Sequence, residues 1–184
     1  MKIQPILNSE KLILRPFTLS DASYVQRLAG DWEIADTTWN IPHPYEDGMA
    51  EEWIAKHQGL FDEGKEVNFA VTFKADDSLI GAISLMKVMK NHQAEIGYWI
   101  GKQFWNQGFC TEAGKAIIKY GFTELELNRI CGEHISRNQA SGQVMLKLGM
   151  RHEGCRRQHF YKKPRFEDLE LYGILKDENV KINV

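Results

Sequence analysis

The clearest chemical signal in this sequence is a short turn, Gln103 to Ala113, which contains Gly108. Residues 94–100 alternate like a strand before it, and apolar residues recur at helical spacing after it, at Ala113, Ala116, Ile117 and Tyr120. A glycine-containing turn that opens a helix directs unpaired backbone N–H groups and the positive end of the helix dipole at an anion. The pattern therefore predicts a pyrophosphate site. It also occurs in plain strand-to-helix connections, and the turn alone does not decide between the two.

Bulk properties indicate an intracellular, cytoplasmic protein. The 184 residues are 43% hydrophobic and 26% charged, with a net charge of −2, so nucleic-acid binding is not expected. Cys110, Cys131 and Cys155 lack metal-ligand spacing and are expected to be reduced thiols. The N-terminal apolar runs are too short for a signal peptide, and no apolar stretch approaches the ~20 residues of a membrane span.

The elements that must position the turn follow from periodicity. Strands are expected at 11–15, 67–73, 79–86, 94–100, 128–135, 150–160 and 168–175, and helices after Thr18–Asp21 and at about 111–125 and 139–148. The three strands from 67 to 100 form an antiparallel meander, whereas residues 31–66 show only scattered helix-like stretches. The sequence predicts one domain, 1–184, with an α/β (α+β) fold: a mixed, mostly antiparallel sheet with helices on both faces. Ligands in such sheets bind where the topology switches, here after residue 100.

Several segments resemble the GNAT superfamily of acetyl-CoA-dependent N-acetyltransferases. Trp105-Asn-Gln-Gly-Phe-Cys110 is similar to its cofactor motif, Q/R-x-x-G-x-G/A, with Gly108 at the central glycine, Trp105 in place of Gln/Arg and Cys110 in place of the small last residue. The tryptophan resembles the ribosomal-protein N-terminal (RimJ/RimL-type) branch. Other segments also resemble that branch: Ser9–Pro16, Ala94–Ile100, Asn138–Ser141, Lys147–Met150 and Glu153–Gly154.

The resemblance implies an acetyl-CoA site. The turn would present N–H groups to the pyrophosphate, and the end of strand 94–100 would pair with the peptide-like pantetheine arm. Asn138 would hold pantetheine amides or cap the helix that begins near 139, and the two roles are compatible. The expected cofactor-binding residues are Trp99, Ile100, Gly101, Asn106, Gln107, Gly108, Phe109, Cys110, Thr111 and Asn138.

The same resemblance suggests two catalytic residues. Glu95 is the leading candidate for the base that deprotonates the amine, with a carboxylate paired to a neighbouring cation as the alternative. Ser141 resembles the serine that protonates the departing thiolate, with an ordinary helix hydroxyl as the alternative. His134 is a second candidate base, although a lone strand histidine is more often structural. Cys110 fits as a tolerated small residue, and a catalytic thiolate at a helix N-terminus is the sharper alternative.

The acceptor remains open at this level. The resemblance favours a protein α-amine of the ribosomal-protein N-terminal type; a polyamine, a small amine and an antibiotic are the alternatives. The acidic segment 46–66 would suit a cationic acceptor or be a solvated helix face. The basic segment 147–165 would contact CoA phosphates, nucleic acid or only water. A non-catalytic acyl-CoA sensor and a ribosome-binding module are the rival classes, and a homodimer is compatible with the resemblance.

Overall fold

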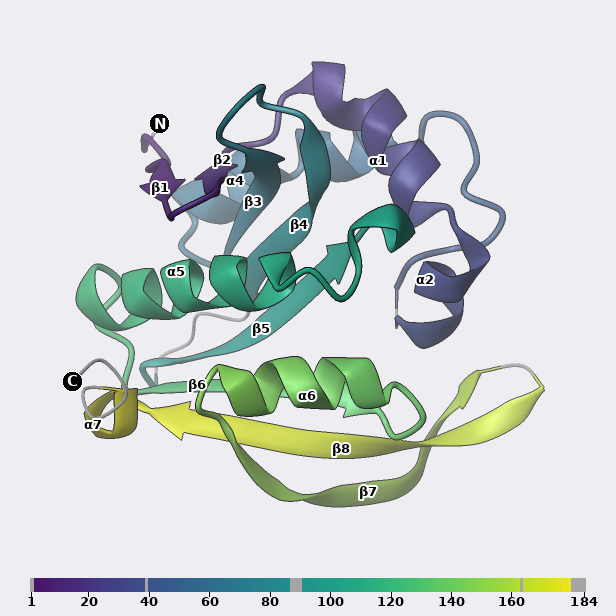
Figure 1. Ribbon diagram of the computed structural model, residues 1–184, viewed down its shortest axis with the longest axis vertical. Coiled ribbons are helices and arrows are strands. Elements are labelled where there is room, and N and C mark those ends of the chain that lie inside the picture. The colour runs from purple at the N-terminus through teal and green to yellow at the C-terminus, as the bar shows by residue number, and fades with distance from the viewer. Residues whose placement is uncertain (1, 39, 87–90, 163, 180–184) are drawn as a thin grey trace.

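A mixed β-sheet runs through the computed structural model, which describes residues 2–38, 40–86, 91–162 and 164–179 (Figure 1). Within these residues the sheet has eight strands in the order β1-β2-β3-β4-β5-β6-β8-β7. The strands are β1 (Leu7–Asn8), β2 (Leu12–Arg15), β3 (Glu66–Phe73), β4 (Leu79–Met86), β5 (Gln93–Ile100), β6 (Arg129–Ile135), β7 (Arg151–Lys162) and β8 (Arg165–Leu175). The helices are α1 (Ala22–Ala29), α2 (Trp32–Thr37), α3 (Met49–Ala55), α4 (His57–Asp62), α5 (Phe109–Thr123), α6 (Gln139–Lys147) and α7 (Lys176–Asn179). Short 3-10 turns cover Leu19–Asp21 and Lys102–Phe104.

The predicted meander is confirmed as β3, β4 and β5, which pair antiparallel in sequence order. Asp77 takes a positive φ of 57° in the turn between β3 and β4, a conformation that aspartate tolerates better than most residues. The parallel pair is β5 and β6, and the other neighbouring strands are antiparallel. The mixed, mostly antiparallel sheet is therefore as predicted.

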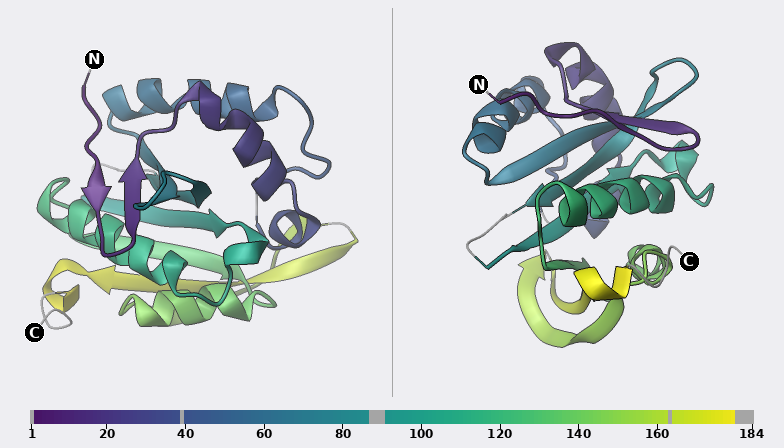
Figure 2. Two further views of the ribbon diagram at one scale, coloured as in Figure 1. Left: turned by 45° about the horizontal axis from the view of Figure 1, so that its top comes forward. Right: turned by 90° about the vertical axis from the view of Figure 1, so that its left-hand side faces the viewer.

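Helices cover both faces of the sheet, as the sequence predicts. α5 and α6 lie side by side on one face, with β5 visible between them (Figure 1), and their apolar residues join the larger buried cluster. α1 and α3 pack on the other face in a second cluster that includes Ala70 and Leu79. The first strands and the β7–β8 hairpin lie at opposite edges (Figure 2). No helix of the described residues has the length and apolarity to span a membrane.

The segment that periodicity left undivided, 31–66, forms three short helices. Asp31 caps α2 by accepting a hydrogen bond from the Glu33 N–H at 2.9 Å. α4 packs on β3, two strands from β5, and the acidic side chains of α3, Glu51 and Glu52, are exposed. The carboxylates of Glu51 and Glu52 thus lie at the surface, as both alternatives for the acidic segment require.

Candidate active site

The sheet divides between its two parallel strands. β5 and β6 are paired only at Gln93 with Arg129, Ala94 with Ile130 and Glu95 with Cys131. Beyond Glu95 these strands have no paired residues in the described part of the chain; β5 stays with β4, and β6 stays with β8. The carboxyl ends of β5 and β6 therefore separate, and each is followed by a helix whose N-terminus lies at that end. This division is the topological switch that the sequence predicts.

The main chain of β5 offers hydrogen bonds on the open side of the division. The Gly101 N–H donates to Ile80 O on β4 at 2.8 Å. Because an antiparallel ladder alternates, Trp99 also faces β4, whereas Tyr98 and Ile100 direct their main-chain groups toward the division. Ile100 O accepts a hydrogen bond from the Trp105 indole N–H at 2.6 Å. Of the three residues predicted here, only Ile100 directs its main chain toward the division, whereas Trp99 and Gly101 face β4. Tyr98 also faces the division, and the sequence did not predict it.

The turn before α5 has the geometry of an anion site. Asn106 and Gly108 have positive φ values of 60° and 85°. The first helical hydrogen bond runs from the Glu112 N–H to Gly108 O at 3.0 Å, so the N–H groups of Phe109, Cys110 and Thr111 lie ahead of it without an intrahelical acceptor. A Cβ placed on Gly108 would meet no atom within 4 Å, so the space outside the turn is open. These features fit a pyrophosphate.

The side chains of the turn serve structural purposes. Phe109 is buried, and its ring packs edge-on against Phe73 with centroids 5.1 Å apart. Gln107 donates to Gln103 O at 3.0 Å. Burial raises the pKa of the Cys110 thiol to about 12, which opposes the effect of the helix dipole. This favours the protonated thiol at neutral pH, as expected if Cys110 is a tolerated small residue.

The start of α6 brings together two predicted residues and one that was not predicted. Asn138 caps the helix, its side-chain oxygen accepting from the Ser141 N–H at 3.2 Å. The Tyr98 hydroxyl lies 2.8 Å from Ser141 Oγ and 3.1 Å from Ser141 O, which connects β5 to α6 across the division. The residue type and strand position of Tyr98 gave no signal of this contact, because it depends on how α6 crosses the sheet.

The two candidate bases lie on opposite faces of the sheet. Glu95 is on the face away from α5 and α6, since Ala94 and Ile96 beside it belong to the cluster with those helices. It is paired in register with Cys131 on β6. His134 is buried and stacks on Tyr172 with centroids 5.4 Å apart. Its Nδ1 lies 2.8 Å from Ile135 O, while Nε2 has no hydrogen-bond partner among the described residues.

Beyond the carboxyl ends of β5 and β6, the loop before α6 is connected to α2 and the β7–β8 hairpin. Arg137 forms ion pairs with Asp36 at the end of α2 and with the buried Glu167 of β8, the latter at 2.9 Å. Lys102, just after β5, pairs with Glu33 of α2 at 2.5 Å. These contacts place α2 beside the division.

Several cations of the basic segment 147–165 are paired with carboxylates. Arg151 pairs with Glu178, Arg156 with Glu133 and Arg165 with Glu167. Lys163 lies outside the described residues. In each of these three pairs a neighbouring carboxylate balances the charge of the arginine in part.

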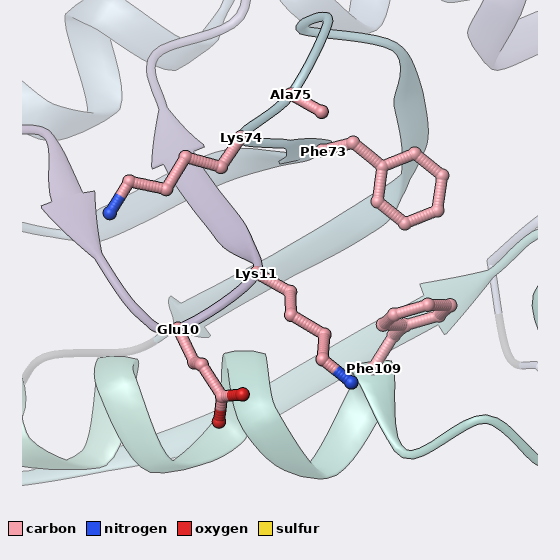
Figure 3. Close-up of a pocket in the computed structure, with 6 residues that line it drawn as sticks. All are labelled: Glu10, Lys11, Phe73, Lys74, Ala75 and Phe109. Atoms are coloured by element: carbon pink, nitrogen blue, oxygen red, sulfur yellow. The ribbon is translucent and has the colours of Figure 1, made fainter.

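A hollow of about 410 Å³ lies on another side of the α5 N-terminus, between the β1–β2 and β3–β4 turns. Figure 3 shows the rings of Phe73 and Phe109 facing it, with Lys11 and Lys74 at its edges. Phe109 is the one predicted site residue among those that line it, so we distinguish this hollow from the division between β5 and β6.

Residues 11–151 match the model of the acetyltransferase (GNAT) domain. The chain is 33% identical to the uncharacterized N-acetyltransferase p20 of Bacillus licheniformis over 174 residues, which is 94% of this chain and 97% of that protein. It is 34% identical over 103 residues to the ribosomal-protein-serine acetyltransferase of Escherichia coli, covering 55% of this chain and 58% of that protein. The structure of a spermidine N-acetyltransferase from Vibrio cholerae, in complex with CoA and spermine, has the same fold at 22% identity, with a TM-score of 0.79 over 92% of this chain and 98% of that one.

The divided sheet and the glycine turn at the start of α5 form the candidate site, and the matches identify the class of protein as an acetyltransferase. The chain belongs to the GNAT acetyltransferase family. It is an N-acetyltransferase that uses acetyl-CoA. The resemblance inferred from the residues around Gly108 is thus confirmed, and so is the cofactor that it implied.

Proposed function

We propose that this enzyme acetylates a protein N-terminal α-amine, of the kind found on ribosomal proteins. The observation that carries the proposal is the pairing of acidic side chains with arginines beside the carboxyl ends of β5 and β6, where we place the entrance for the acceptor. Asp36 and Glu167 share Arg137, and Glu133 pairs with Arg156. A polyamine carries several positive charges and needs carboxylates to receive them. An entrance whose carboxylates are matched by arginines suits a chain end with one amine.

The chemistry of the amine supports the same choice. An α-amine has a pKa of about 7.7–8.0, against about 10.4 for a lysine-type amine, so a useful fraction is neutral at physiological pH. A carboxylate such as Glu95, which reaches the amine through water, is then a sufficient base. The strong base that a polyamine or lysine side chain would require is not needed.

In the proposed reaction, different residues bind acetyl-CoA and transfer the proton. The N–H groups of Phe109, Cys110 and Thr111 hold the pyrophosphate, and the main chain of Tyr98 and Ile100 pairs with pantetheine. Transfer of the acetyl group would form a bond from the amine nitrogen to the acetyl carbon and break the carbon–sulfur bond, whose electron pair would leave on sulfur. The amine proton would pass through Glu95 to solvent. The sulfur would then be reprotonated from solvent.

The test compares peptides with spermidine as acceptors. A set of peptides with free N-termini is incubated with enzyme and acetyl-CoA, and the site of acetylation is read by mass spectrometry. Each peptide contains an internal lysine, and a copy with a blocked N-terminus is the control. We expect acetylation at free N-termini, no product from blocked copies, and little turnover of spermidine. Efficient acetylation of spermidine with none of the peptides would overturn the proposal in favour of a polyamine enzyme.

Substitution of Glu95 by Gln tests the assigned base and separates an enzyme from an acyl-CoA sensor. The expected result is a loss of about 10²-fold or more in turnover at neutral pH, the usual contribution of a general base. The loss should shrink as the pH rises and the free amine becomes more abundant. A chain that binds acetyl-CoA but acetylates none of the acceptors would instead be a sensor.

A further inference from the structure

The hydrogen bond between Tyr98 and Ser141 joins the two elements that flank the division of the sheet. Ser141 is buried in the first turn of α6, and its Oγ lies 2.8 Å from the Tyr98 hydroxyl. The nine-residue helix α6 directs its positive end at this point. A negative charge that develops beside Ser141 would therefore meet a hydroxyl donor and a helix dipole together.

The pair has one arrangement that leaves a proton available for such a charge. If Ser141 donates to Tyr98, its proton is occupied. If Tyr98 donates to Ser141 Oγ, the serine proton is directed outward. The second acceptor near Tyr98, Ser141 O, is a carbonyl of the first helical turn that also accepts a helical hydrogen bond, and its 3.1 Å contact is longer than the 2.8 Å contact to Oγ. The shorter contact to Oγ and a nearby anion both favour the outward arrangement.

Burial keeps the tyrosine in its donor form. It raises the pKa of Tyr98 well above its usual range, and the hydrogen bond to Ser141 opposes this only in part. Tyr98 thus remains a neutral donor at any physiological pH. A phenol that ionised readily would reverse the direction of the pair.

We propose that Tyr98 and Ser141 form a two-hydroxyl donor chain, Tyr98 to Ser141 to sulfur, that stabilises the departing thiolate by hydrogen bonding and not by giving up a proton. This inference rests on the proposed acetyl transfer and on the expectation from the sequence that Ser141 lies beside the departing thiolate. A thiolate, whose thiol has a pKa of about 8.5, is a far weaker base than a serine alkoxide, so a full proton transfer from Ser141 is uphill. Tyr98 is a positioning residue that acts through Ser141, and hydrogen bonds in series strengthen one another.

The test uses CoA itself and needs no acceptor. If the Tyr98–Ser141 pair stabilises a thiolate, the pKa of the CoA thiol is lower in the complex than in free CoA. The affinity for CoA then rises with pH between these two pKa values. Calorimetry at about pH 6.5 and about pH 9.5 gives this rise, and desulfo-CoA, which lacks the thiol, corrects for other titrations. We expect a relative gain of about tenfold for the wild-type protein, since a hydrogen bond to a charged group shifts a pKa by about one unit or more.

Variants then separate the two hydroxyls. Ser141→Ala should abolish the gain, and Tyr98→Phe should reduce it to about threefold. The double variant should equal Ser141→Ala, because Tyr98 acts only through the serine. The matched control is Tyr120→Phe, which removes a phenol hydroxyl from the same buried cluster on α5 and should leave the gain intact.

Two results overturn the inference: no gain in the wild-type protein, or an undiminished gain in Tyr98→Phe. Binding of desulfo-CoA serves as the folding control for each variant. Failure of the wild-type protein to bind either CoA or desulfo-CoA would instead contradict the cofactor site, so the two failures are distinguishable.

Discussion

Replacement of Gly108 by alanine separates the conformational need for glycine in the α5 turn from its role toward the cofactor. Gly108 has φ 85° and ψ −7°, and an added Cβ would meet no protein atom within 4 Å. A non-glycine residue in this left-handed conformation costs about 1–2 kcal/mol. The stiffer unfolded chain of alanine offsets about 0.4–1 kcal/mol of this. The expected net loss is about 1 kcal/mol, or about 2–4 °C in Tm for a chain of this size.

The chain contains a matched control for this substitution. Gly48 precedes α3 with φ 86° and ψ −22°, and its added Cβ also meets nothing within 4 Å. Gly48→Ala should therefore lower the Tm by the same amount as Gly108→Ala. The two substitutions introduce the same backbone strain, but only the turn at Gly108 is proposed to bind the pyrophosphate.

Acetyl-CoA binding, measured by calorimetry, distinguishes the two variants. If the turn holds the pyrophosphate as proposed, the Gly108→Ala methyl stands where that group approaches, and loss of one hydrogen bond to a charged group costs about 1.5–3 kcal/mol. The Kd should rise by about tenfold to a hundredfold in Gly108→Ala and stay unchanged in Gly48→Ala. Equal stability losses with unchanged affinity in both variants would refute the assignment of the turn as the pyrophosphate site.

Three further predictions concern stability and binding. Burial lowers the pKa of His57 to about 4, whereas an unfolded histidine has a pKa of about 6.5. As the pH falls from about 6.5 to about 4, the unfolded chain binds the extra proton, so up to about 3 kcal/mol of the free energy of unfolding should be lost. In His57→Leu, chemical denaturation should show a flatter pH dependence of stability. Arg137→Met leaves the buried carboxylate of Glu167 without this cation and should lower the free energy of unfolding by about 1–3 kcal/mol. Arg165 is an exposed arginine that pairs with the same carboxylate, so Arg165→Met should cost less than about 1 kcal/mol. Equal losses in the two variants would contradict the importance of burial. Asn138→Ala and Asp31→Ala each remove a helix cap and about 1 kcal/mol, but only the first should weaken acetyl-CoA binding; equal affinities would leave Asn138 as a cap alone.

Periodicity was sufficient for the two long helices and for every strand of the described sheet except β1, whose two residues are too few to show an alternation. The alternation of Val67, Phe69 and Val71 is typical of a half-buried strand, and these side chains enter the larger cluster. The glycine turn was found because its function and its backbone conformation both select glycine at position 108. Strand–turn–helix order then located the division of the sheet correctly.

The short helices of 31–66 were beyond such reasoning, because helices of six or seven residues carry too few turns to show a period. Two features of the site also depend on contacts distant in sequence. Arg137 meets Asp36 across a separation of 101 residues, and Tyr98 meets Ser141 across 43. Neither pair has a spacing that a single sequence reveals.

The most direct measurement of the central claim is amide hydrogen exchange with and without acetyl-CoA. We expect acetyl-CoA to slow exchange in peptides that cover residues 96–101, 106–111 and 138–142, which surround the division between β5 and β6 and the starts of α5 and α6. Residues 73–75, in the hollow on the other side of α5, should be unaffected. Protection of residues 73–75 with none at 106–111 would contradict the account and move the cofactor to the hollow.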